Sequence, residues 1–314
     1  MQNRILFLDT THSFLLTALR NDGFNCDEDY TSNREGIEEK IGVYDGVVIR
    51  SRFKIDKQFI DAASNIKFIA RVGAGMENID VEYALSKNIQ CLHAPEGNRT
   101  AVAEQCIATL LCLFNNILKA DPEVRQNKWI REDNRGIELE GKTVAIIGYG
   151  NMGSAFAQRL QGFGVKVLCY DKYKQNYINN SVCRETTLQE IFDKADVVSF
   201  HIPYNSENHY LVDEKFINSF KREIYIINTS RGKILKTDDL VKALETKKVL
   251  GACLDVLEYE SISFENIGED EPEAFTKLKL MPNVILTPHI AGWTYESNKK
   301  MAEVLVGKIM QLFH

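Results

Sequence analysis

The chain has 314 residues, of which 44% are hydrophobic and 26% are charged, and these fractions are ordinary for a globular protein. A net charge of −6 disfavours a general binder of nucleic acid or of membrane surfaces. No apolar run approaches the roughly 20 residues that a membrane-spanning helix needs. The seven cysteines include no CxxC pair and the start of the chain lacks a signal-peptide pattern, so a cytoplasmic location is expected.

In the first third of the chain, short apolar runs alternate with amphipathic stretches. The runs predict strands at 5–8, 46–49, 68–70 and 90–92. The stretches predict helices, of which 14–20 and 81–87 are the clearest. Such alternation is typical of βαβ units around a parallel sheet.

After a long helix expected from about residue 101, the alternation begins again. New strands are expected at 143–147, 166–170, 197–200, 224–228, 251–256 and 284–287. Six strands with helices between them predict a doubly wound, Rossmann-type parallel sheet. The amphipathic stretch 296–314 is too short for a core of its own and should pack on the first domain. We therefore expect a discontinuous substrate-binding domain, residues 1–95 and 291–314, and a dinucleotide-binding domain, residues 96–290.

A GxGxxG turn follows the expected strand 143–147 and precedes a helix. Its residues, all expected at the cofactor, are Gly148, Tyr149, Gly150, Asn151, Met152 and Gly153. In this pattern the glycines permit a tight turn, close approach of a pyrophosphate and close helix packing. Asp171 ends the next expected strand, where a carboxylate would bind both ribose hydroxyls and repel a 2′-phosphate. The pattern predicts NAD in preference to NADP.

Three later strand ends carry reactive side chains. Arg231 follows the strand 224–228, Glu260 follows 251–256, and His289 follows 284–287. Because ligands bind beyond the carboxyl ends of parallel strands, we expect these side chains to converge. Arginine can hold a carboxylate through two hydrogen bonds, histidine can move a proton near neutral pH, and a neighbouring glutamate stabilises the imidazolium. The set suits hydride transfer at a 2-hydroxy or 2-keto acid.

At these residues the chain resembles the NAD-dependent D-2-hydroxyacid dehydrogenase family, over nearly its whole length. The resemblance is carried by the glycine-rich turn, RVGAGMENID at 71–80, NTSRG at 228–232, ACLDV at 252–256 and PHIAG at 288–292. It implies a Rossmann-type domain and a second, discontinuous flavodoxin-like α/β domain. It also implies Arg231 as the carboxylate-binding residue, His289 as the acid–base residue and Glu260 as its partner.

The glutamate has a competitor. Family members usually carry proline directly after it, whereas here Ser261 follows Glu260 and an acidic insertion extends to Phe275. Glu271 is followed by proline and is the alternative. We favour Glu260, because its spacing from the strand is set by geometry and an insertion can follow it.

The resemblance also implies further contacts. Residues expected near the cofactor are His201, Pro203, Thr229 and Asp255. The loop with Gly73 and Ala74 would bind the substrate carboxylate through backbone N–H groups, since such nests suit anions. No His, Cys and Asp cluster has metal-ligand spacing, so no metal is expected.

A basic cluster stands out in the first domain of this acidic chain. It comprises Arg50, Arg52, Lys54 and Arg71, with Ser51 among them. These positions resemble those of D-3-phosphoglycerate dehydrogenases, where such cations face a phosphate. Arg131 resembles an arginine supplied there across a dimer, and the tract 101–135, apolar on one side, predicts a homodimer through the NAD-binding domain. The alternative for the cations is surface charges or ion pairs.

The leading interpretation is NAD-dependent oxidation of D-3-phosphoglycerate to 3-phosphohydroxypyruvate, the entry to serine synthesis. A glyoxylate or hydroxypyruvate reductase, or another D-2-hydroxyacid dehydrogenase, is the alternative enzyme. An NAD-sensing binding protein of the corepressor type is the alternative of another class, which the reactive residues at the strand ends disfavour. Because the chain ends at His314, serine feedback through a C-terminal regulatory domain is not expected.

Overall fold

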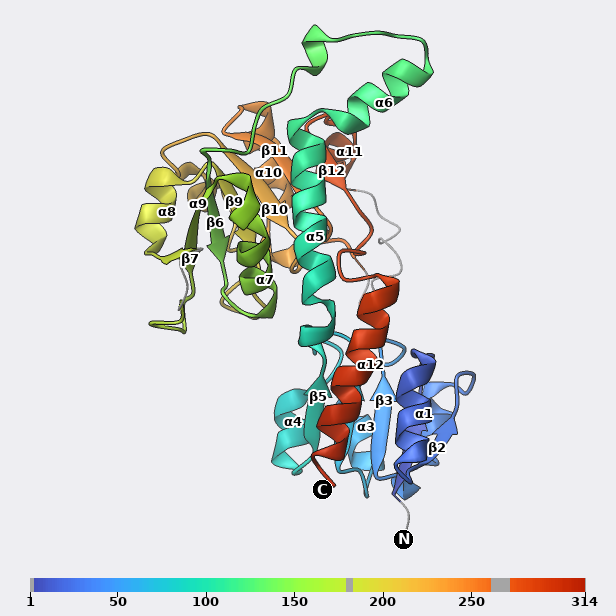
Figure 1. The fold of residues 1–314 in the computed structure, drawn as a ribbon. Coiled ribbons are helices and arrows are strands. Elements are labelled where there is room, and N and C mark those ends of the chain that lie inside the picture. The colour runs from blue at the N-terminus through green and yellow to red at the C-terminus, as the bar shows by residue number, and fades with distance from the viewer. Residues whose placement is uncertain (1–2, 179–182, 261–271, 314) are drawn as a thin grey trace. The chain divides into compact units, whose positions relative to one another are not determined.

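The computed structural model describes residues 3–178, 183–260 and 272–313, which form two units (Figure 1). Unit 1 comprises Met1–Arg99 and Trp293–His314, and unit 2 comprises Thr100–Gly292. The divisions expected from the sequence, after residues 95 and 290, lie close to these. The chain thus returns to unit 1 after completing unit 2.

Unit 1 is built on a parallel five-stranded sheet in the order β2-β1-β3-β4-β5. Its strands are β1 (Arg4–Phe7), β2 (Asn25–Glu28), β3 (Gly46–Ile49), β4 (Phe68–Arg71) and β5 (Gln90–His93). This is the flavodoxin-like strand order, as expected. β3 and β4 are buried throughout, which explains the apolar runs at 46–49 and 68–70 in the sequence. β4 also includes the buried Arg71. β2 was not predicted, because an edge strand with the sequence NCDE has no such run.

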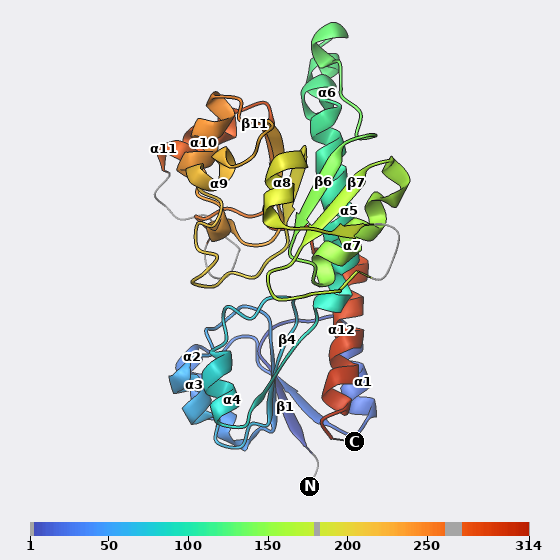
Figure 2. The same ribbon diagram turned by 90° about the vertical axis from the view of Figure 1, so that its left-hand side faces the viewer.

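Helices cover both faces of this sheet (Figure 2). α1 (Ser13–Asn21) packs with α12 (Tyr295–Met310) on one face, where Leu15, Leu305 and Ile309 are buried. The other face carries α2 (Arg34–Glu38), η1 (Ile41–Val43), α3 (Lys57–Ala62) and α4 (Val81–Ser86). The C-terminal helix therefore belongs to the core of unit 1, as its amphipathic pattern indicated.

Unit 2 contains a seven-stranded parallel sheet in the order β12-β11-β10-β9-β6-β7-β8. The strands are β6 (Thr143–Ile147), β7 (Lys166–Tyr170), β8 (Arg184–Glu185), β9 (Val197–Phe200), β10 (Ile224–Asn228), β11 (Val249–Leu254) and β12 (Val284–Leu286). From β8 to β11 this is the Rossmann order 3-2-1-4-5-6, with β12 added at the edge. The expected sheet is confirmed, and the two-residue β8 is the strand that the sequence did not reveal.

The helices of unit 2 also lie on both faces of its sheet. They are α5 (Pro95–Phe114), which begins in unit 1, α6 (Ile117–Arg125), α7 (Asn151–Arg159), α8 (Leu188–Lys194), α9 (Glu214–Asn218), α10 (Thr237–Glu245) and α11 (Glu273–Leu280), with short 3-10 turns η2 (Glu132–Asn134), η3 (Leu160–Phe163) and η4 (Gly232–Ile234). α5 and α7 share one buried core, and α8 to α11 share the other. Both cores consist mainly of aliphatic and aromatic side chains. Their close packing fixes the carboxyl ends of the strands, where a site can form.

α5 and α6 meet at Asn116, whose backbone is left-handed with a φ of 52°. α5 buries Cys106, Leu110 and Phe114, whereas α6 leaves Leu118 exposed. No single helix among the described residues has the length and apolar character of a membrane span, and these two reach it only as a pair bent by 60°.

Candidate functional site

The glycine-rich turn lies between β6 and α7. Gly148 has a φ of +95°, and a Cβ atom there would clash with the carbonyl oxygen of His201, so glycine is required. A Cβ atom at Gly153 would likewise clash with the carbonyl oxygen of Gly148. At Gly150, in contrast, nothing in the described part of the chain would lie within 4 Å of a Cβ atom. The backbone at Gly150 therefore faces open space.

The first turn of α7 is suited to an anion. Gly150 is its N-cap and provides no side-chain cap, and Asn151 and Met152 follow as its first residues. Uncapped N–H groups and the positive end of the helix dipole attract phosphate groups. Together with the open space at Gly150, this geometry fits the pyrophosphate of a dinucleotide.

Asp171 lies at the end of β7, beside the glycine-rich turn. Its Oδ2 accepts the N–H of Tyr149 at 2.9 Å and its Oδ1 accepts the N–H of Tyr173 at 3.0 Å. Each carboxylate oxygen keeps further acceptor capacity for a ribose hydroxyl. The flanking lysines are engaged elsewhere: Lys174 donates to the Tyr149 carbonyl and Lys172 pairs with Glu207, both at 2.7 Å.

A pocket of about 590 Å³ adjoins this carboxylate. It is lined by residues 170–175, Tyr177 and residues 185–187. The charge of Asp171 at its wall favours a ribose with free hydroxyls over a ribose 2′-phosphate.

The imidazole of His201 packs in the core of unit 2. Its Nε2 shares a hydrogen bond with Ser199 Oγ at 2.8 Å, and its ring lies 5.6 Å from that of Phe156 in α7. Its Nδ1 is buried with no hydrogen-bond partner among the described residues. Burial lowers the pKa of His201 to about 4, so the ring is neutral near pH 7. The backbone of His201, rather than its ring, borders the glycine-rich turn.

Two other residues expected at the cofactor lie at the ends of β9 and β10. The Pro203 carbonyl accepts a hydrogen bond from Asn208 at 2.8 Å. Thr229 Oγ1 lies 3.4 Å from Cys106 Sγ in α5. Both residues follow a strand at its carboxyl end, where a dinucleotide would bind.

The loop after β10 is shaped by Asn228. Its Oδ1 accepts the N–H and hydroxyl of Ser230 at 3.1 and 2.8 Å, and its Nδ2 donates to the Arg231 carbonyl at 3.1 Å. The Arg231 guanidinium donates from Nη1 to the Ser230 carbonyl at 2.6 Å. The short polar sequence thus forms a compact turn that fixes the backbone of Arg231.

His289 and Glu260 form the central pair of the site. Nδ1 of His289 lies 2.7 Å from Oε2 of Glu260, and the two side chains are 23% and 14% exposed. The other carboxylate oxygen, Oε1, accepts the N–H of Leu257. A carboxylate partner assigns the proton to Nδ1, which leaves Nε2 as the acceptor nitrogen of a neutral ring. The competing Glu271 lies outside the described residues.

Asp255 holds the loop that carries His289. Its side chain is 3% exposed and accepts the Thr287 hydroxyl at 2.6 Å and the N–H groups of Ile290 and Ala291 at 2.9 and 2.8 Å. Its carbonyl accepts the N–H of His289 at 2.8 Å. Burial raises the pKa of Asp255. The family resemblance implied that Asp255 lies near the cofactor. Its hydrogen bonds to this loop, including the one from the Thr287 hydroxyl, were not predicted.

The basic residues of unit 1 occupy strand ends of its sheet. Arg50 follows β3, and its backbone N–H and that of Ser51 bond to Oδ2 of Asp9 at 2.6 and 3.2 Å. Arg71 ends β4, is 8% exposed and donates from Nε to the Arg50 carbonyl at 3.2 Å. The loop after Arg71 continues through Gly73, which packs on its guanidinium, and Ala74, whose carbonyl lies 2.6 Å from Nδ1 of His93.

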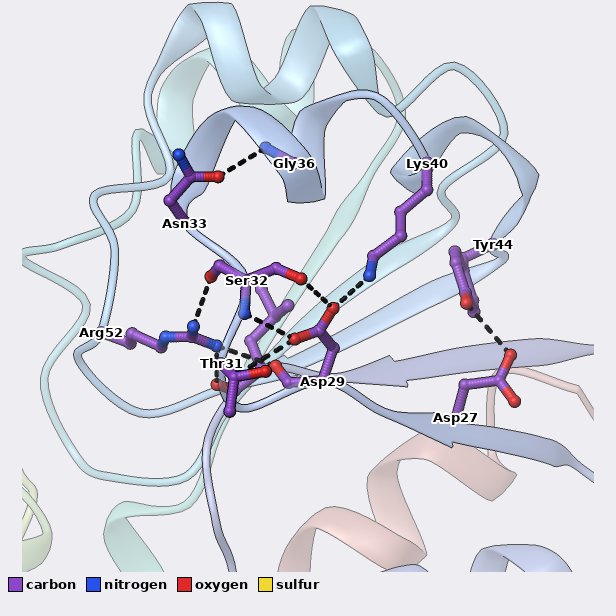
Figure 3. A network of polar contacts seen from close by, with 10 residues as sticks. Asp27, Asp29, Thr31, Ser32, Asn33, Gly36, Lys40, Tyr44 and Arg52 are labelled. Atoms are coloured by element: carbon purple, nitrogen blue, oxygen red, sulfur yellow. Dashed lines mark hydrogen bonds and ion pairs between the residues drawn. The ribbon is translucent and has the colours of Figure 1, made fainter.

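Arg52, a member of the basic cluster, bonds to the backbone of unit 1. Its guanidinium donates to the carbonyls of Leu8 at 3.0 Å and Asp29 at 2.8 Å, and to that of Ser32 (Figure 3). The carboxylate of Asp29 in turn pairs with Lys40. Arg52 therefore ties the loop after β2 to the sheet.

The tract after α6 exposes apolar side chains. Trp129 is 80% exposed and Ile130 is 39% exposed. Arg131 follows them and directly precedes η2. Within the described ranges, no group of three or more His, Cys, Asp or Glu side chains could hold a metal ion.

Comparisons with known proteins agree with this architecture. The sequence model of a family described as "D-isomer specific 2-hydroxyacid dehydrogenase, NAD binding domain" matches residues 107–291. A glyoxylate reductase of Thermofilum pendens is 34% identical over 283 residues, which cover 88% of this chain and 80% of the relative. A D-3-phosphoglycerate dehydrogenase of Archaeoglobus fulgidus is 30% identical over 310 residues, which cover 98% of this chain and 57% of the relative.

Among solved structures, a D-lactate dehydrogenase from Aquifex aeolicus, complexed with NAD and lactic acid, is similar with a TM-score of 0.82 at 29% identity. The match covers 99% of this chain and 95% of that one. The shared fold thus extends over both units of the chain.

Proposed function

The chain belongs to the D-isomer specific 2-hydroxyacid dehydrogenases, NAD-dependent oxidoreductases that act on a CH–OH group, and we propose that its substrate is D-3-phosphoglycerate. The reaction would yield 3-phosphohydroxypyruvate, NADH and a proton. One observation carries the choice of substrate: Arg50 directly follows β3 and Arg71 ends the neighbouring β4, in a chain of net charge −6. Cations gathered at strand ends suit a substrate with a second anionic group besides its carboxylate.

His289 would be the general acid–base residue of this reaction. In the oxidative direction, Nε2 accepts the proton of the substrate hydroxyl, since Nδ1 faces Glu260 at 2.7 Å. The Glu260 carboxylate stabilises the imidazolium that results and holds the ring in place. When bound, NAD supplies the nicotinamide that accepts the hydride.

Arg231 would hold the substrate carboxylate. Its guanidinium is planar and suited to two parallel hydrogen bonds. The turn built by Asn228 and Ser230 holds its backbone, which favours a fixed orientation of the substrate. Positive charge near the substrate oxygen also polarises it in the transition state.

A glyoxylate or hydroxypyruvate reductase is the second candidate. It is favoured by the Thermofilum pendens relative, which this chain covers over 80% of its length, compared with 57% for the Archaeoglobus fulgidus phosphoglycerate dehydrogenase. Both candidates use the same acid–base pair and differ in the substrate group that unit 1 must accept.

A homodimer through unit 2 is the proposed assembly. The exposed apolar side chains of Leu118, Val124 and Trp129 support it, because large apolar side chains exposed along one segment are common at protein interfaces. In such a dimer Arg131 would extend toward the neighbouring copy.

A kinetic panel tests the substrate. We expect kcat/KM with NAD to be highest for D-3-phosphoglycerate, and about 100-fold or more above that for D-glycerate, because a desolvated phosphate contact is lost in the latter. Arg50→Gln should reduce this preference, whereas the exposed control Lys87→Gln should leave it unchanged. Higher efficiency with glyoxylate or hydroxypyruvate and NADH would select the reductase instead.

A further inference from the structure

The guanidinium of Arg50 lies over the ring of Trp293. The distance from Arg50 Cζ to the centre of the ring is 4.5 Å, which is within the range of a cation–π interaction. Both residues belong to unit 1, although 243 positions separate them in the chain. Trp293 is the first residue after the chain returns to this unit.

The backbone of Arg50 is held on two sides. Its N–H is bonded to Asp9, and its carbonyl accepts Nε of Arg71 at 3.2 Å and Nδ2 of Asn78 at 3.3 Å. These bonds fix the backbone of Arg50 but not its side chain. The stack on Trp293 restricts the orientation of that side chain.

Trp293 is itself attached to a rigid element. Thr294 directly after it caps α12 through a reciprocal capping box with Ser297, and α12 buries Met301 and Leu305 in the core of unit 1. The indole is nonetheless 58% exposed, so the stack faces solvent on one side. A ligand can reach the pair without disturbing the core.

A stacked guanidinium keeps its hydrogen-bond donors. All five N–H groups of arginine lie in the plane of the group, and a ring below that plane engages none of them. No ion pair of the Arg50 side chain occurs among the residues that the structure describes. Trp293 thus orients the Arg50 guanidinium and leaves its N–H donors available to an anion. A carboxylate partner would instead occupy those donors.

The location favours a ligand. Arg50 directly follows β3, which adjoins β1 at the point where the strand order reverses, and ligands of flavodoxin-like sheets bind at this switch point. Arg52, two residues on, is committed to three carbonyl groups. Arg50 is the more available of the two cations for a substrate.

We propose that Trp293 is a specificity-determining residue, which positions Arg50 to bind the phosphate of a phosphorylated 2-hydroxy acid. The inference rests on the proposed function, because it assigns the phosphate of that substrate to Arg50. Trp293 acts through Arg50 and is therefore a positioning residue.

The kinetic test compares two substrates in four proteins. The ratio of kcat/KM for D-3-phosphoglycerate to that for D-glycerate is measured in the wild type, Trp293→Ala, Trp293→Phe and the control Tyr295→Ala, which removes a 94% exposed ring two positions away. We expect Trp293→Ala to lower the ratio about 10-fold through KM for the phosphorylated substrate. Trp293→Phe should restore much of it and Tyr295→Ala should not change it.

A binding test needs no turnover. The chain has two tryptophans, so Trp129→Phe leaves Trp293 as the single indole fluorophore. Titration of this variant with D-3-phosphoglycerate, and separately with inorganic phosphate, should change the indole emission in a saturable manner. Arg50→Gln in the same background should abolish the change. An emission that neither ligand alters overturns the inference.

The outcomes separate the two proposals. A wild type without preference for D-3-phosphoglycerate overturns the proposed function, and the fluorescence titration with inorganic phosphate then decides the assignment of the anion site alone. A wild type that prefers D-3-phosphoglycerate, with the same preference in Trp293→Ala, overturns the role of Trp293 and leaves the proposed function standing.

Discussion

Nδ1 of His289 and Oε2 of Glu260 lie 2.7 Å apart, although the residues are 29 positions apart in the chain. Glu260 follows β11 and His289 follows β12, and these strands are paired in parallel. Both residues therefore leave the sheet at the same edge. The contact depends on this strand pairing and on the loop that Asp255 holds.

Replacement of His289 by alanine should lower kcat by about 10²- to 10⁴-fold, the usual contribution of a general acid–base group. NAD affinity, measured by fluorescence titration, should stay nearly unchanged, because His289 is not among the residues expected to contact the cofactor. A variant with near wild-type turnover would remove His289 from the mechanism.

Replacement of Glu260 by glutamine should move the acidic limb of the kcat/KM profile to lower pH, because an imidazolium loses its nearby anion. The profile is measured from pH 5 to pH 9 with saturating NAD. Glu271→Gln serves as the control and should leave the profile in place. If the control shifts the profile and Glu260→Gln does not, Glu271 is the partner of His289.

Replacement of Asp171 by alanine should weaken the discrimination between NAD and NADP. The carboxylate at the end of β7 would repel a 2′-phosphate, so its loss should raise kcat/KM with NADP relative to NAD by about 10-fold or more. Steady-state kinetics with both cofactors measure the ratio. Equal use of the two cofactors by the wild type would contradict the role of Asp171.

Protonation of His201 should destabilise the fold in mild acid. Burial lowers its pKa to about 4 in the folded chain, compared with about 6.5 in an unfolded chain. Between these two values the unfolded chain binds a proton that the folded chain does not, so the free energy of unfolding falls as pH falls. The loss from pH 7 to pH 4 should reach about 3 kcal/mol.

Urea denaturation of His201→Gln should show a smaller loss over this interval than the wild type. The exposed His209 provides the control, since His209→Gln should follow the wild-type curve. Parallel curves for wild type and His201→Gln would show that the ring takes up a proton without unfolding.

Sedimentation velocity at micromolar concentration tests the homodimer. Leu118 is 59% exposed in α6, and Leu118→Asp should shift a dimer toward monomer, because a buried unpaired charge is costly at an interface. Leu280→Asp, at an 80% exposed position of α11, is the control and should sediment like the wild type. A monomeric wild type would exclude the dimer and with it a contribution of Arg131 to a neighbouring copy.

The sequence was most informative where strands are largely buried. β6, β7, β9 and β10 were predicted with their observed ends, because each is an apolar run between polar turns. β2 and β8 were missed, since a polar edge strand and a two-residue strand have no such pattern. These two strands are defined by hydrogen bonds to their neighbours in the sheet, which the amino-acid composition of a segment does not reveal.

The same contrast holds for the site. Glu260 and His289 were expected to converge, because their positions after strands restrict where they can lie. The use of Arg52 by three carbonyl groups, and the stack of Arg50 on Trp293, depend on chain segments far away in sequence. A run of cations in the sequence does not reveal which of them the fold uses for its own stability.

The backbone of His289 has a φ of +54°, a left-handed conformation in which a side chain with a Cβ costs about 1 kcal/mol. Three hydrogen bonds to the Asp255 carboxylate hold the loop in this geometry. Asparagine and glycine adopt this conformation more readily, so chemistry and folding favour different residues at the same position. A library of position 289 selected for heat resistance alone should therefore be enriched in inactive asparagine and glycine variants.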